Sequence, residues 1–202
     1  MYFLSKKKKI GLFFGSFNPV HLGHLIVANY IHNIELVDEV WFVVSPQSPF
    51  KDSSELLSVG DRLEILEKSI LHVPYFRVCD IELHLPIPSF TINTLEAIKD
   101  QYEDINFSLI MGADNVKGFK EWLRWESIEQ LVDAILVYSR NGKVSTFSKE
   151  NLSSKMIVLD SPIIEISSTH IRRLILEAKS IRYLVPQNTE DLIKHKYQLG
   201  FE

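Results

Sequence analysis

The chain has little cysteine and no long apolar segment. Cys79 is the single cysteine among 202 residues, which excludes an intramolecular disulfide and a zinc site built on cysteines. No apolar run approaches the roughly 20 residues that span a bilayer, and no secretory signal pattern is present. These absences predict a cytoplasmic protein without membrane contact.

A surplus of positive charge is also absent. Lys and Arg number 22 and Asp and Glu number 26, so the formal net charge is −4. The dense basic run at residues 6–9 is interpreted as a solvated lead-in to the first strand, and no nucleic-acid partner is expected. Two common nucleotide-binding fingerprints are missing too. Residues 11–15 do not continue as G-x-G-x-x-G, and there is no Walker A loop.

What the chain does have is a regular alternation of apolar runs and helical patterns. Strands are expected at residues 10–14, 39–44, 76–79, 106–111, 134–138 and 156–159. Helices are expected at 20–34, 59–71, 91–101, 168–178 and 186–197, and one or two helices within 113–131. This order predicts an α/β fold, a Rossmann-like, doubly wound and mainly parallel sheet flanked by helices. One domain over residues 1–202 is expected, with a small C-terminal helical part from about residue 160.

The most informative segment joins the first expected strand to the first expected helix. Residues 15–24 read Gly-Ser-Phe-Asn-Pro-Val-His-Leu-Gly-His. A helix N-terminus favours anions, and positions i and i+3 share a face, so His21 and His24 can meet one phosphate. Gly23 leaves room for a flat group such as a nucleobase. The histidine pair alone would also fit half a metal site, but a turn leaving a buried strand at the sheet edge favours phosphate.

A second helix start carries hydroxyls and a cation. Residues 166–172 read Ile-Ser-Ser-Thr-His-Ile-Arg. Ser and Thr are good N-caps, so a capped amphipathic helix with an exposed arginine explains the pattern without any function. The functional interpretation is that Ser168, Thr169 and the forked donor of Arg172 hold a polyphosphate.

Together the two segments resemble nucleotidyltransferases with H-x-G-H and I-S-S-T-x-I-R motifs, and most of all the bacterial nicotinate-nucleotide adenylyltransferases. Residues 89–96 are similar to that family's S-Y-T-x-D-T-L-E segment, and residues 111–115 and 119–126 to its G-A-D and F-x-x-W-x-x-W segments. The chain departs from the family pattern at four positions. Asn18 and Asn93 stand where the family has Asp, Phe50 replaces the His of P-H-K, and Asn141 replaces the Pro of R-P-G.

The resemblance implies adenylyl transfer from ATP to nicotinate mononucleotide, with release of pyrophosphate, in NAD biosynthesis. His21, His24 and Arg172 would be catalytic, and Mg²⁺ would arrive with ATP rather than in a protein metal site. The implied ATP contacts are Gly15, Ser16, Phe17, His21, Gly23, His24, Ile166, Ser168, Thr169 and Arg172. The implied mononucleotide contacts are Ser16, Phe17, Lys51, Thr91, Thr94, Asp114 and Trp122, with Trp122 stacked on the pyridine ring.

Several alternatives stay open. The acceptor could be nicotinamide mononucleotide or phosphopantetheine, and the chain could be a nucleotide-binding module without catalysis. H-x-G-H also occurs in class I aminoacyl-tRNA synthetases, but residues 153–156 do not match K-M-S-K-S. A homo-oligomer is neither required nor excluded.

Three sets of residues have a purely structural interpretation as an alternative to the functional one. Trp122 could be a core or surface aromatic, and Thr91 and Thr94 could be a helix cap and a core-facing hydroxyl. Asp80, Glu82 and His84 alternate as on one face of a strand, a spacing that could supply metal ligands. A half-exposed strand explains them better.

Overall fold

The computed structural model describes residues 7–46, 56–139 and 152–199. Its centre is a six-stranded sheet in which every neighbouring pair is parallel, in the order β3-β2-β1-β4-β5-β6. The strands are β1 (Lys8–Gly15), β2 (Glu39–Val44), β3 (Phe76–Cys79), β4 (Ile105–Gly112), β5 (Ala134–Tyr138) and β6 (Met156–Val158). This is the doubly wound order of the Rossmann fold, so the expected fold class is confirmed. No helix within the described ranges is long and apolar enough to cross a membrane.

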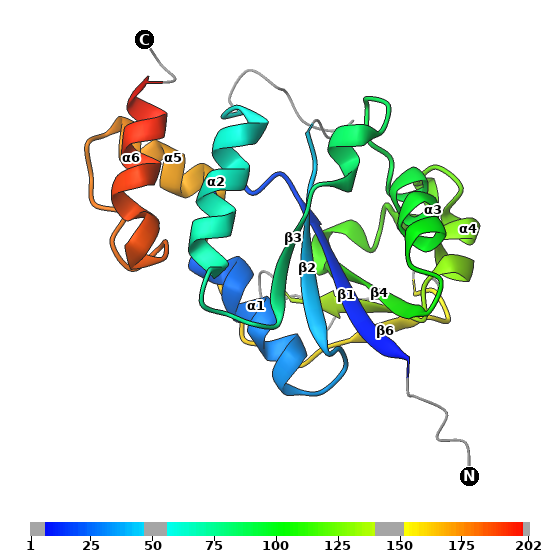
Figure 1. Cartoon of the computed structure of the whole chain (residues 1–202). Helices are drawn as coiled ribbons and strands as arrows, with labels where there is room; N and C mark the ends of the chain where they lie inside the picture. Colours follow the sequence, from blue (N-terminus) through cyan, green and yellow to red (C-terminus); the bar gives the residue numbers. More distant parts are fainter. Residues whose placement is uncertain (1–6, 47–55, 140–151, 200–202) are drawn as a thin grey trace.

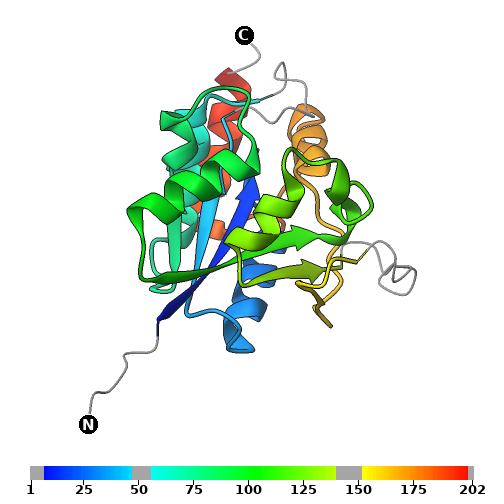
Figure 2. The same cartoon turned by 90° about the vertical axis from the view of Figure 1, so that its right-hand side faces the viewer.

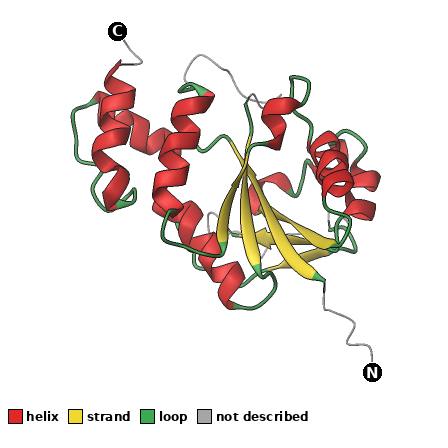
Figure 3. Cartoon of the chain, viewed as in Figure 1, coloured by secondary structure: helices red, strands yellow, loops and turns green. Residues whose placement is uncertain are grey.

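Helices cover both faces of the sheet (Figures 1 and 3). One layer holds α1 (Leu22–Asn33), α2 (Val59–Ile70), α5 (Ser168–Leu176) and α6 (Glu190–Leu199), and the other holds α3 (Thr91–Gln101) and α4 (Trp125–Leu131). Figure 2 shows α3 and α4 in front of the sheet. Helices α1 to α4 pack on the sheet through apolar faces, which is why the sequence shows helical spacing between its strands, whereas α6 contacts α2 and α5.

The strands alternate between the two cores because successive side chains point to opposite faces. Ile10 and Leu12 of β1 pack with α3 and α4, whereas Phe13 packs with α1 and α2. In β2, Val40 and Phe42 pack in the same core as Phe13. Trp41 and Val43 pack in the same core as Leu12. Every strand in the middle of the sheet is therefore covered on both sides, and the carboxyl edge is left for a ligand.

Two expectations about local structure were wrong, those for residues 80–84 and for the start of the C-terminal helix. Residues 80–84 form no strand, since pairing of β3 with β2 ends at Cys79, and a 3-10 turn, η1 (Ile81–His84), follows. Residues 113–131, expected to hold one or two helices, hold one α-helix, α4, which follows two 3-10 turns, η2 (Ala113–Asn115) and η3 (Phe119–Glu121). The break lies at Arg124, whose φ of 53° ends any continuous helix. The C-terminal helix begins at Glu190, after a 3-10 turn, η6 (Gln187–Thr189).

Candidate active site

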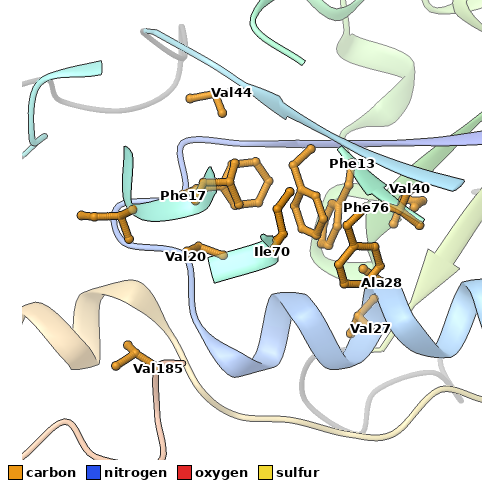
Figure 4. Close-up of a cluster of buried hydrophobic side chains, with 14 of the residues drawn as sticks. Phe13, Phe17, Val20, Val27, Ala28, Val40, Val44, Ile70, Phe76 and Val185 are labelled. Carbon is orange, nitrogen blue, oxygen red and sulfur yellow. The ribbon is translucent and has the colours of Figure 1, made fainter. Parts of the chain in front are cut away.

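The turn after β1 is held by an aromatic anchor. Phe17 has a φ of 44°, which turns its ring back beneath the strand, where it is 2% exposed. The ring lies edge-on to Phe13 and Phe42, with centroid distances of 5.9 and 5.5 Å, inside the cluster drawn in Figure 4. A Cβ at Gly15 would lie 3.0 Å from the Phe17 ring, so a glycine is needed for this approach. The result is a fixed turn whose backbone faces the carboxyl edge of the sheet.

Asn18 fastens the same turn to two distant elements. Its Oδ1 accepts hydrogen bonds from the backbone N–H of Leu57 at 3.0 Å and from the hydroxyl of Tyr197 at 2.7 Å. Both partners are donors to one oxygen, so an amide oxygen meets them as a carboxylate oxygen would. The departure from Asp at this position therefore leaves the turn tied to the entrance of α2 and to α6.

A buried arginine lies beneath the turn. The guanidinium of Arg62, in α2, donates to four backbone carbonyls at 2.7–3.1 Å, and the side chain is 1% exposed. The four acceptors are Ser16, Ser45, Pro46 and Leu57. Burial lowers the pKa of Arg62 from its ordinary value, but a guanidinium remains charged in proteins. A permanent cation thus joins the ends of β1 and β2 to the start of α2.

The two histidines of α1 lie together at the start of the helix. His21 is its N-cap, and the His21 and His24 rings are stacked with centroids 3.6 Å apart. Nδ1 of His24 accepts from the backbone N–H of His21 at 3.3 Å. In a neutral imidazole that bond leaves the proton on Nε2, so His24 has a donor for a ligand.

Helix α5 starts against the same turn. Ser167 caps it by accepting from the backbone N–H of His170 at 3.2 Å. The Ser168 hydroxyl donates to the carbonyl of Pro19 at 2.9 Å, and Arg172 donates to that of Asn18 at 3.1 Å. Segments about 150 residues apart in sequence are therefore in direct contact.

These elements enclose a hollow of about 590 Å³ at the carboxyl edge of the sheet, which we call the first hollow. Two helix starts and a strand end surround it, as phosphate sites in such folds require. Its lining includes Gly15, Ser16, Phe17, Asn18, His24, Gly112, Asp114, Trp122, Tyr138, Ser168, Thr169 and Arg172.

A second hollow, of about 460 Å³, adjoins the first. Five residues line both hollows: Phe14, Gly15, Ser16, Asn115 and Trp122. The remaining walls come from the end of β2, from η1, from the start of α3, and from η3 and α4, and include Ser45, Glu82, Ser89, Phe90, Thr91 and Glu121. The first hollow is edged by hydroxyl groups and the Arg172 guanidinium, while the second is lined by the aromatic side chains of Phe90 and Trp122, which suit a flat ring.

Four of the expected site residues lie elsewhere. His21, Gly23 and Ile166 line a small third hollow behind His24, next to Ile164. A Cβ at Gly23 would lie 2.9 Å from Nδ1 of His21, so this glycine lets the two rings stack. Thr94 is fully buried beneath the second hollow, and its hydroxyl donates to Glu82 at 2.8 Å. Lys51, Phe50 and Asn141 lie outside the described residues.

Sequence reasoning missed three residues that hold the site. Arg62 follows the helical spacing of Ile65 and Leu66, so a cation on an apolar helix face was the available signal. Glu82 was placed on a strand face, yet it is 1% exposed. Tyr197 was counted only as part of a terminal helix, and no local pattern connects it with Asn18, 179 residues away.

Comparisons with known proteins give the family of the chain. The family model described as "Cytidylyltransferase-like" matches residues 12–174. The "Probable nicotinate-nucleotide adenylyltransferase" of Cytophaga hutchinsonii is 45% identical over 194 residues, which cover 96% of this chain and 100% of that protein. The protein of the same name from Bacteroides fragilis is 46% identical over 89% of this chain and 88% of its own length.

A solved structure shares the fold. The nicotinic acid mononucleotide adenylyltransferase of Plasmodium falciparum superposes with a TM-score of 0.79 at 21% identity, covering 96% of this chain and 98% of that one. At that identity the likeness establishes the architecture alone. The sequence relatives establish membership: the chain belongs to the cytidylyltransferase-like family and, within it, to the nicotinate-nucleotide adenylyltransferases.

Proposed function

We propose that the chain transfers the adenylyl group of ATP to nicotinate mononucleotide, forming nicotinate adenine dinucleotide and pyrophosphate, as a step of NAD biosynthesis. The observation that carries the proposal is the meeting of the two hollows at Gly15 and Ser16. A transfer between two nucleotides needs two adjoining sites with the reacting phosphates at their junction. The solved Plasmodium relative is described as complexed with NaAD, the product of such a transfer.

ATP would occupy the first hollow with its phosphates between the starts of α1 and α5. Nε2 of His24 would donate to the α-phosphate, while Ser168, Thr169 and Arg172 would hold the β- and γ-phosphates. His21 would hold the His24 ring in place by stacking on it. His21 also lines the small third hollow, together with Gly23 and Ile166. The buried charge of Arg62 would add a positive field beneath Ser16.

The reaction needs positioning rather than a general base. An oxygen of the mononucleotide phosphate, already ionised at neutral pH, forms a bond to the α-phosphorus of ATP. The bond from that phosphorus to the bridging oxygen breaks, and its electron pair leaves with pyrophosphate. Negative charge grows on the leaving group, where hydrogen-bond donors and Arg172 lower the barrier most.

The residues of the site fit a magnesium ion that is carried by the triphosphate. Within residues 7–46, 56–139 and 152–199, no cluster of three or more His, Cys, Asp or Glu could form a protein-only cage. Mg²⁺ commonly keeps several waters and binds through substrate phosphates with one or two carboxylates. Asp114 lines the first hollow and is the carboxylate suited to that role. Bound there, the ion would neutralise charge on the phosphates.

The mononucleotide would occupy the second hollow. The Trp122 ring is half-buried and packs on Phe119 at a centroid distance of 5.5 Å, which fixes it for stacking on a pyridine ring. Thr91 begins α3 at the wall of this hollow, and the positive end of a helix favours a carboxylate on that ring over a carboxamide. Lys51 would add a phosphate contact.

A pyrophosphate-release assay across acceptors tests the proposal. The chain, ATP and Mg²⁺ are combined in turn with nicotinate mononucleotide, nicotinamide mononucleotide and phosphopantetheine. Fastest release with the first acceptor is the expected result. Release with phosphopantetheine alone would assign a different transferase, and ATP binding without release would identify a nucleotide-binding module.

A further inference from the structure

Glu82 is a buried carboxyl group in the wall of the second hollow that the proposed reaction does not use. It is 1% exposed, and its Oε1 accepts from the Thr94 hydroxyl at 2.8 Å. Its Oε2 is buried without a hydrogen-bond partner among the described residues, as is the hydroxyl of Ser89 in the same wall. An ionised carboxylate would not be left with so few donors at such a depth.

The charges around the second hollow also favour a neutral Glu82. Within the described part of its lining, Glu82 and Glu121 are the charged side chains, and no Lys or Arg is among them. The other titratable groups on β3 and the turn after it, Arg77, Cys79, Asp80 and His84, line a separate hollow beside Trp41. A second negative charge on Glu82 would oppose an anionic ring substituent, and the described lining holds no cation to offset it.

We propose that Glu82 is a neutral carboxyl group in the wall of the second hollow, and that its neutrality lets this hollow prefer a mononucleotide with a carboxylate on its ring over one with a carboxamide. This proposal rests on the function proposed above. Glu82 acts as a positioning group as well, because Thr94 lies in the first turn of α3, whose first residue, Thr91, lines the hollow.

The protonation state follows from the surroundings. Burial raises the pKa of Glu82 above its ordinary value, and the hydrogen bond from the Thr94 hydroxyl offsets only part of that rise. When the group ionises at higher pH, it repels a ring carboxylate but not a ring carboxamide. Both mononucleotides carry the same phosphate, so the ratio of their kcat/KM values cancels phosphate ionisation and isolates Glu82.

The test measures the acid-to-amide ratio of kcat/KM from pH 5.5 to 9.5 in the wild type, Glu82→Gln and Glu121→Gln. Glutamine is neutral at every pH and keeps an oxygen for Thr94. The wild-type ratio is expected to fall about tenfold or more as Glu82 ionises, and the Glu82→Gln ratio to stay level. Glu121→Gln removes an exposed carboxylate from the same hollow and should retain the wild-type fall.

Three results would overturn the proposal. The first is a wild-type ratio that does not change with pH, and the second is the same fall with pH in Glu82→Gln. The third is a ratio that is higher in Glu82→Gln than in the wild type at every pH, which would show that Glu82 is ionised throughout. A second readout does not depend on activity. Since a raised pKa destabilises the fold as pH rises, the Tm of the wild type should fall relative to Glu82→Gln above the ordinary Glu pKa. If neither mononucleotide reacts, the proposed function fails, and this Tm difference still decides whether Glu82 is neutral.

Discussion

Replacing Arg62 by methionine should destabilise the protein more than any surface change. Methionine keeps an apolar stem of similar length in α2 but removes every donor. The carbonyls of Ser16, Ser45, Pro46 and Leu57 then lose their bonds from the guanidinium. Three chain segments that meet at the carboxyl edge lose their common link.

The magnitude follows from the number of bonds and their burial. A hydrogen bond to a charged group contributes about 1.5–3 kcal/mol, and an orphaned buried acceptor costs about 1–3 kcal/mol. Because Arg62 is 1% exposed, little water is already present to replace it. The four losses are coupled, and water entry relieves part of them, so we expect a net loss of roughly 3–5 kcal/mol in the free energy of unfolding.

Urea denaturation, followed by circular dichroism, measures that loss. The matched control is Arg77→Met, which removes an exposed guanidinium that stacks on Trp41 at 5.4 Å and should cost less than about 1 kcal/mol. Arg62→Lys should recover only part of the stability, because an ammonium group cannot reach four carbonyls in a planar fork. A loss below about 1 kcal/mol for Arg62→Met, or equal losses at both positions, would refute the reasoning.

The remaining predictions concern the site. In His24→Ala, kcat should fall by about 10²–10³ with little change in the KM for ATP, because its Nε2 donor acts on charge that grows in the transition state. Trp122→Ala should raise the KM for the mononucleotide about tenfold or more through lost stacking, with the KM for ATP nearly unchanged. Tyr197→Phe removes the 2.7 Å bond to Asn18 and should cost about 1 kcal/mol in urea denaturation, with lower kcat.

Each of these has a contradicting outcome. An unchanged kcat in His24→Ala would remove that histidine from catalysis. Equal rises in both KM values for Trp122→Ala would assign the tryptophan to folding. A Tyr197→Phe variant as stable and active as the wild type would show that α6 does not support the turn.

Much of the fold could be predicted because the sequence patterns are strong and local. The bounds of β2, β3, α3 and β5 agree with expectation, since buried parallel strands are continuous apolar runs bounded by turn residues. Ser58 caps α2 by accepting from the backbone N–H of Asp61 at 3.1 Å, a preference that is local to the sequence. The expected convergence of the two motif-bearing helix starts is also present, through Ser168 and Pro19.

The second hollow was harder to predict, because its wall depends on contacts between distant segments. The alternation of residues 80–84 resembles a strand, but β2 offers no partner beyond Val43, so the chain turns and buries Glu82. Thr94 shares a helix face with Thr91 in sequence terms, yet it is fully buried and its hydroxyl donates to that buried acid. The sequence around Glu82 does not indicate a contact with Thr94, and the sequence around Thr94 does not indicate a contact with Glu82.

The most direct test of the central claim is a competition with ATP labelled at the α-phosphorus. The chain is given equal concentrations of nicotinate and nicotinamide mononucleotides, and the labelled products are separated. The account predicts that the label enters nicotinate adenine dinucleotide at neutral pH, with little in the amide dinucleotide. Label that enters the amide product preferentially, or that stays in ATP, would contradict it.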